Sequence, residues 1–183
     1  LMAALVATLV ADFFLVIHRV YPLGVGIFWF AHAFYALRFG GRRAAWFLPL
    51  ALPVAGMIWL VTRDLLVALA AGYITLFIIS YTCMIIALKA KKYPPPNHFL
   101  AAAGMTLFVF CDIFVAIFNL GGMGLIQNHA IAMFAVDAIW LFYAPAQICL
   151  ALSAMRFTRP FYVLDKTDKA SSKTPQEQGY AQG

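Results

Sequence analysis

The chain has 183 residues, of which 64% are hydrophobic and only 11% are charged, and its formal net charge is +6. Soluble domains carry about 25% charged residues, so this composition excludes an ordinary soluble protein. Several continuous apolar runs reach the roughly 20 residues that a helix needs to cross a bilayer. Their polarity does not alternate as it does in the strands of a membrane β-barrel. We therefore expect an all-α integral membrane protein, a polytopic helix bundle embedded in a lipid bilayer.

The apolar runs predict six membrane-spanning helices in one transmembrane domain covering residues 1–156. Charged residues, glycines or prolines end each run, as is typical of the loops between helices. After residue 156 the composition changes to Lys, Ser, Thr, Gln and Gly, which predicts a disordered cytoplasmic tail over residues 157–183. The six helices are expected at residues 1–17, 22–39, 44–62, 65–89, 98–119 and 130–155.

Basic residues are unevenly divided between the loops on the two sides of the predicted bundle. One side receives the arginines of loop 40–43, the lysines of loop 90–97 and the basic residues after 155, whereas the other receives Arg19 and Arg63. Positively charged loops favour the cytoplasm, so we expect these loops and the C-terminus to be cytoplasmic. Because topology accounts for the positive charge, no nucleic-acid surface is expected. The short loops suit the inner membrane of a bacterium.

Three aspartates, Asp12, Asp112 and Asp137, lie inside the predicted spans. An ionisable side chain at this depth is costly unless it faces a cavity or a partner, so each is a candidate functional residue. At a rise of 1.5 Å per residue, all three lie roughly 7–11 Å from the outer ends of their helices, which predicts one shared cavity. For Asp137, close to the outer boundary, simple hydration is the alternative interpretation.

Further polar side chains are predicted close to these aspartates. His32 and Tyr35 are three residues apart and share one face of the second helix, and Tyr143 and Gln147 are four apart in the sixth. Pro145 lies between the latter two, where a proline frees a carbonyl group and can kink the helix. The alternatives are that His32 is a hydrogen-bonded packing residue and that Gln147 links helices without a further role.

Three segments resemble motifs of the YhhN/TMEM86 family. The run ADFFLVI…GIFWFAHAFYALRF resembles the start of that family, in which an aspartate late in one span precedes a His-x-x-Tyr signature in the next. The run AAGMTLFVFCDIFVAI is similar to the segment around a second aspartate, and YAPAQICLALS is similar to a Tyr-x-x-Ala-Gln segment. Together they cover most of residues 1–156 in the order of the family.

The resemblance implies a lysoplasmalogenase, an integral membrane hydrolase that cleaves the vinyl-ether bond of lysoplasmalogens or related ether lysolipids. The products are a fatty aldehyde and a glycerophospho head group. The resemblance also implies one or two further spans before Leu1. The lysophospholipid substrate would be taken from the bilayer.

Vinyl-ether hydrolysis needs a carboxylic acid that protonates carbon and a negative group that stabilises the resulting cation. We expect Asp12 and Asp112 to fill these two roles, without assigning which is the acid. His32, Tyr35, Tyr143, Gln147 and Asp137 are the expected substrate-binding residues. This chemistry requires no metal and no cofactor, and the spacing of histidines and acids shows no His-Glu-x-x-His set.

Two other functions are compatible with the same aspartates. In a small transporter or proton-coupled carrier they would be relay sites, and the protein would move a solute without any chemical product. In a lipid-binding or assembly subunit they would affect stability or partner binding, and no turnover would be measured. The sequence does not indicate an oligomeric state.

Overall fold

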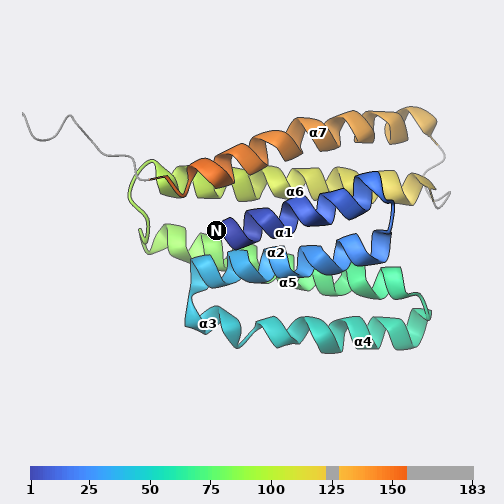
Figure 1. Cartoon of the computed structure of the whole chain (residues 1–183), viewed down its shortest axis with the longest axis horizontal. Helices are drawn as coiled ribbons and strands as arrows, with labels where there is room; N and C mark the ends of the chain where they lie inside the picture. Colours follow the sequence, from blue (N-terminus) through green and yellow to red (C-terminus); the bar gives the residue numbers. More distant parts are fainter. Residues whose placement is uncertain (123–127, 156–183) are drawn as a thin grey trace, which may run out of the picture.

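A computed structural model describes residues 1–122 and 128–155, and the regular elements in these residues are all helical. Lipid offers no hydrogen-bond partners, so an apolar run satisfies its own backbone groups by forming a helix. In chain order the elements are α1 (Met2–Asp12), the π-helical turn η1 (Phe13–Ile17), α2 (Tyr21–Gly40), α3 (Arg42–Ala45), the 3-10 turn η2 (Leu48–Leu50), α4 (Ala51–Thr62), α5 (Leu65–Lys89), α6 (Asn97–Gly122) and α7 (His129–Leu152) (Figure 1).

The prediction of a transmembrane helix bundle is confirmed. Within the described residues, five helical segments are long and apolar enough to cross a membrane, and the first segment, Met2–Ile17, is apolar but shorter. The third predicted span is not one continuous α-helix, because the 3-10 turn η2 separates α3 from α4. Pro49 lies in this turn and has no backbone N–H to donate, which explains the interruption. The predicted tail, residues 157–183, lies outside the described residues.

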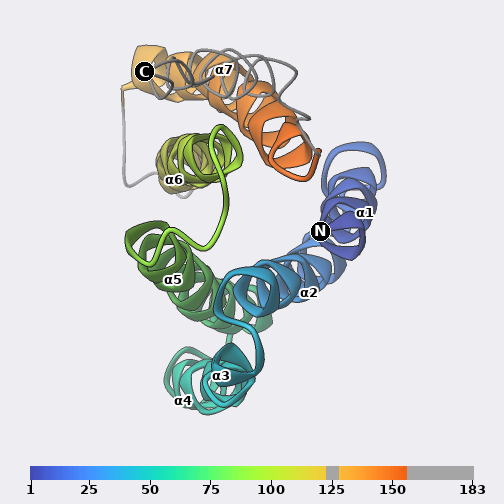
Figure 2. The ribbon, with the colours of Figure 1, turned by 90° about the vertical axis from the view of Figure 1, so that its left-hand side faces the viewer.

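When the bundle is viewed along its axis, the helices form a ring in the order α1, α2, α5, α6 and α7 (Figure 2). Helix α4 lies outside the ring and packs against α5. Packing is extensive between α1 and α2, between α2 and α5, and between α6 and α7, but limited between α5 and α6. The ring therefore consists of an N-terminal part (α1, α2 and α5) and an α6–α7 pair, and few contacts join the two.

Small residues allow the helices within each part to approach closely. The indole of Trp29 on α2 occupies the space where Gly72 on α5 has no Cβ, and its Nε1 donates a hydrogen bond to the Leu69 carbonyl at 2.8 Å. In the α6–α7 pair, a Cβ on Gly104 would lie 2.7 Å from Cγ of Leu150. Close approach of this kind is the usual basis of helix association in membranes, where lipid is as apolar as the side chains.

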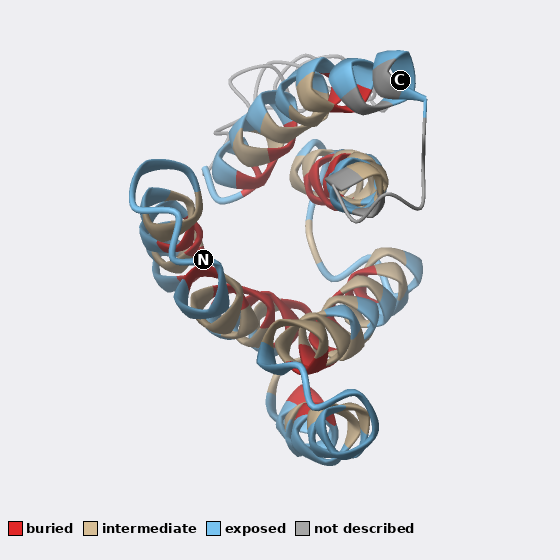
Figure 3. Cartoon of the chain, turned by 90° about the vertical axis from the view of Figure 1, so that its right-hand side faces the viewer, coloured by how far each residue is buried: buried red, intermediate tan, exposed pale blue. Residues whose placement is uncertain are grey.

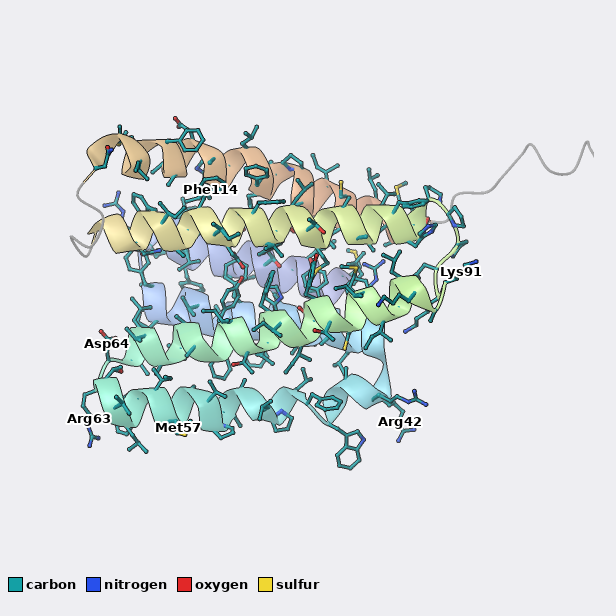
Figure 4. The ribbon with its side chains drawn as sticks, turned by 180° about the vertical axis from the view of Figure 1, so that it is seen from behind. Arg42, Met57, Arg63, Asp64, Lys91 and Phe114 are labelled. Atoms are coloured by element: carbon teal, nitrogen blue, oxygen red, sulfur yellow. The ribbon has the colours of Figure 1, made fainter. Side chains whose placement is uncertain are left out.

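The buried residues lie mainly on helix faces that are turned toward other helices, and the exposed residues lie mainly on the outward faces (Figure 3). Large apolar side chains such as Met57 and Val61 on α4 are among the exposed residues, as expected for surfaces in contact with lipid. Charged residues mark the ends of the bundle: Arg42 and Lys91 lie at one end, and Arg63 lies at the other (Figure 4). We call the end with Arg42 and Lys91 the basic end.

Candidate functional site

Two aspartate–tyrosine hydrogen bonds join the N-terminal part to the α6–α7 pair. The hydroxyl of Tyr143 on α7 donates to Oδ2 of Asp12 on α1. The hydroxyl of Tyr73 on α5 donates to Oδ2 of Asp112 on α6 at 2.7 Å. Each carboxyl group thus closes one of the two weakly packed junctions of the ring. Both aspartates are only partly buried, so neither is sealed inside the protein.

Aromatic rings connect the two pairs across the interior of the ring. Phe108 lies one turn before Asp112 on α6, and its ring centroid is 5.9 Å from that of Tyr143 and 6.3 Å from that of Phe28. The ring of Phe28 is in turn 5.9 Å from that of Tyr73. The two pairs therefore border one continuous group of side chains, whereas the cavity expected to be shared by all three aspartates stays a prediction.

The backbone changes its winding directly after Asp12. Helix α1 ends at Asp12, and the next five residues, Phe13–Ile17, form a π-helical turn in which His18 N–H bonds to the Phe13 carbonyl at 3.2 Å. Single π-turns within α-helices are frequent at functional sites. Here the wider turn continues the helix of Asp12 from Phe13 to Ile17.

His32 is fully buried among aromatic rings and has one hydrogen-bond partner among the described residues. Its Nδ1 lies 3.1 Å from Oγ of Ser80, and the Ser80 hydroxyl donates its own proton to the Phe77 carbonyl at 2.8 Å. Ser80 Oγ therefore accepts from Nδ1–H, so that Nε2 of the neutral imidazole is an acceptor. Within the described residues this buried Nε2 has no hydrogen-bond partner. Ser80 thus orients the imidazole through Nδ1, and Nε2 is free to accept a hydrogen bond.

Tyr35 and Gln147 each carry a buried polar atom in the same situation as Nε2 of His32. Within residues 1–122 and 128–155, neither the buried hydroxyl of Tyr35 nor the buried Nε2 of Gln147 has a hydrogen-bond partner. An unsatisfied buried polar group costs about 1–3 kcal/mol, so a group of them indicates a place where water or a ligand binds. With His32, three of the side chains predicted to bind substrate carry an unused buried polar atom.

Asp137 is not brought into this group. Its side chain is exposed on α7, six residues and therefore about 240° around the helix from Tyr143. Its role in substrate binding stays a prediction that the structure does not support by any contact. Among the described residues, no three His, Cys, Asp or Glu side chains gather into a possible metal site.

Sequence reasoning missed the partners that hold the candidate residues. Tyr73 binds Asp112 and Ser80 orients His32, and neither was chosen as a site residue. The available signal was their spacing of seven residues, which places both on one face of α5. The described residues also form a small pocket nearer the basic end, lined by Phe39, Met84, Ala87, Leu88, Tyr93, His98 and Ala101.

A ring of apolar helices with two carboxyl groups hydrogen-bonded at membrane depth defines a polytopic membrane protein with a polar intramembrane site. Comparison with protein families identifies it further: the YhhN family model matches residues 1–154, and the chain belongs to the YhhN family. The resemblance found in the three sequence motifs is confirmed. No curated protein and no solved structure gives a significant match.

Proposed function

We propose that this chain is a lysoplasmalogenase-like hydrolase that cleaves the vinyl-ether bond of a lysoplasmalogen or related ether lysolipid. The observation that carries the proposal is the pair of intramembrane carboxyl groups, Asp12 and Asp112, each held by a tyrosine hydroxyl. Membership of the YhhN family supports it, as does the position of both aspartates within apolar helices.

The reaction needs two carboxyl groups in different protonation states. One protonated aspartate gives its proton to the β-carbon of the vinyl ether, and the double-bond electrons form the new C–H bond, which leaves an oxocarbenium ion. The other aspartate, as carboxylate, stabilises this cation. Water adds to the cation and returns a proton to the first aspartate. The hemiacetal then collapses to a fatty aldehyde and the free glycerol hydroxyl.

The surrounding side chains fit the accessory roles. A hydrogen bond from Tyr73 or Tyr143 holds its carboxyl group in one orientation and stabilises the negative charge when the proton is absent. The unused polar atoms of His32, Tyr35 and Gln147 supply positions for the attacking water and the glycerol hydroxyl. The aromatic group around Phe108 excludes bulk water, which strengthens electrostatic interactions inside the site.

The test is a product assay on purified protein with three lysophospholipids that share chain length and head group. One carries a 1-alkenyl chain, one a 1-alkyl chain and one a 1-acyl chain. We expect aldehyde from the alkenyl lipid alone, because only a vinyl ether is protonated on carbon. In heavy water the aldehyde should carry one deuterium at the carbon next to the carbonyl, with authentic aldehyde in the same buffer as the exchange control. Release of fatty acid from the acyl lipid instead would reject a vinyl-ether hydrolase.

We also propose that the basic end of the bundle faces the cytoplasm, in the inner membrane of a bacterium. Arg42 and Lys91 at this end, against Arg63 at the other, give the charge asymmetry on which the proposal rests (Figure 4).

A further inference from the structure

Arg38 closes the interior of the ring at the basic end. It lies two residues before the end of α2, and its Nη2 donates to the carbonyl and to the hydroxyl of Ser153, after α7, at 2.9 Å and 3.0 Å. Its guanidinium carbon lies 5.2 Å from the centre of the Phe39 ring and 5.6 Å from that of Tyr93. An arginine that only reached toward water would turn outward from a helix end. Arg38 instead crosses from α2 to α7.

Part of this guanidinium donates no hydrogen bond to the described residues. Nη1 of Arg38 is buried and has no hydrogen-bond partner within the described residues. The acceptors bound by Nη2 are neutral, although a buried cation is stabilised chiefly by a negative partner. A second cation adds to the charge, since Nζ of Lys92 donates to the Phe39 carbonyl at 2.8 Å. An anion is therefore the partner that the described residues do not supply at this end of the ring.

Along α7, an unpaired polar atom lies between the level of Asp12 and the level of Arg38. On α7, Tyr143 binds Asp12, and Ser153, which binds Arg38, is ten residues later. At 1.5 Å per residue these two levels are separated by about 15 Å. Gln147 lies about 6 Å along α7 from Tyr143, by the same rise, and has an unused Nε2.

An ether lysophospholipid has the same order of groups and the same length. Its phosphorus is seven bonds from the vinyl β-carbon, which at ordinary bond lengths is about 9 Å when extended. A hydrogen bond of about 3 Å at each end brings the total to about 15 Å. The glycerol, with its free hydroxyl, lies between the two ends, at the level of Gln147.

We propose that Arg38 is the phosphate-binding residue of the site and holds the phosphate of a lysophospholipid whose glycerol lies beside Gln147 and whose vinyl ether lies at the aspartates. The guanidinium is held on Ser153 through Nη2, and its Nη1, which has no hydrogen-bond partner among the described residues, carries two N–H groups that phosphate oxygens can accept. This inference rests on the proposed function for the identity of the lipid. It adds the direction of binding, with the head group at the basic end.

The test measures binding and needs no turnover. Full-length protein in detergent is titrated with a 1-alkyl lysophospholipid, whose saturated ether is not hydrolysed by this chemistry, and with the matching 1-alkylglycerol, which lacks phosphate. We expect the parent to bind the phospholipid more tightly. Arg38→Gln should weaken phospholipid binding about 10- to 100-fold, the usual value of a hydrogen bond to a charged group, and leave alkylglycerol binding unchanged. Arg38→Lys, which keeps the charge without the fork, should recover part of the loss.

Two variants separate phosphate binding from other roles of Arg38. Arg42→Gln removes the same charge from an exposed position at the same end and should not change the preference for the phospholipid over the alkylglycerol. Ser153→Ala removes one contact of the guanidinium but keeps its charge, and should reduce the preference less than Arg38→Gln does. Equal weakening of both ligands by Arg38→Gln, or an equal effect of Arg42→Gln, would overturn the proposal.

Inorganic phosphate distinguishes a lipid head group from a soluble anion. At concentrations matched to the lysolipid it should not compete, because it lacks the glycerol and the chain. Competition by phosphate at equal concentration would overturn the assignment to a lipid. A protein that binds the alkyl phospholipid through Arg38 but releases no aldehyde from the alkenyl lipid would refute the proposed reaction and keep this inference.

Discussion

Tyr73 donates a hydrogen bond to Asp112 across the junction between α5 and α6, with 2.7 Å between the hydroxyl and Oδ2. This junction has little other packing, so the pair both orients the carboxyl group and joins two parts of the ring. Asp12 and Tyr143 do the same between α1 and α7. Structure and proposed chemistry therefore depend on the same four side chains.

Tyr73→Phe removes the hydrogen bond to Asp112 and keeps the aromatic ring of the side chain. A hydrogen bond to a charged group contributes about 1.5–3 kcal/mol, so we expect the rate of aldehyde release to fall about 10- to 100-fold. Tyr21→Phe is the matched control, because Tyr21 is 50% exposed at the start of α2 and should have no effect. An unchanged rate in Tyr73→Phe would show that the orientation of Asp112 does not limit catalysis.

Gln147→Leu replaces an unsatisfied buried amide with an apolar side chain of similar size. Removal of an unpaired polar group should stabilise the empty protein, by up to about 1–3 kcal/mol, and raise its Tm in detergent. Loss of a hydrogen bond to the glycerol should raise KM about two- to tenfold. A fall in Tm would indicate that Gln147 serves the packing of the helices rather than a ligand.

Gly104→Ala and Gly56→Ala should affect stability in opposite directions. A Cβ on Gly104 would lie 2.7 Å from Leu150 Cγ and 3.0 Å from the Ala146 carbonyl oxygen, so the α6–α7 pair has to separate, at a cost of about 1–3 kcal/mol. A Cβ on Gly56 of α4 meets nothing within 4 Å, and alanine there should stabilise the helix by about 0.5–1 kcal/mol. Thermal unfolding in detergent measures both. Equal shifts would contradict the packing described for α6 and α7.

The proposed topology places Arg42 and Arg63 on opposite sides of the membrane. Arg63→Cys should react with a membrane-impermeant thiol reagent in intact spheroplasts, and Arg42→Cys only in inverted vesicles. The parent, whose Cys83, Cys111 and Cys149 lie within helices, provides the background. The opposite labelling pattern would place the basic end outside the cytoplasm.

The sequence was sufficient to predict the helices, and it pointed to polar residues that the structure places in the candidate site. Continuous apolar runs ended by charges and prolines fix helix positions closely, so the boundaries of α2, α5 and α6 differ from prediction by only a few residues. Intramembrane aspartates are costly, and this cost alone pointed to Asp12 and Asp112.

The pairing of side chains could not be predicted in the same way. Asp12 and Tyr143 are 131 residues apart, and their contact depends on the order of helices around the ring. The helices are apolar on every side, because lipid and protein neighbours are equally apolar, so the sequence does not show which face points inward. For this reason Asp137 was grouped with the other aspartates although it is exposed, and Arg38 was not chosen as a site residue.

The most direct test of the central claim is aldehyde release from a lysoplasmalogen by the parent, Asp12→Asn, Asp112→Asn and Asp64→Asn. Asn keeps the size of the side chain but removes its acidity, and Asp64 is an exposed N-cap of α5 that Asn also fills well. We predict aldehyde from the parent and from Asp64→Asn, and none above background from folded Asp12→Asn or Asp112→Asn. Aldehyde at the parent rate from either of these two variants would contradict catalysis by the paired aspartates, and no aldehyde from a folded parent would favour transport or a different lipid.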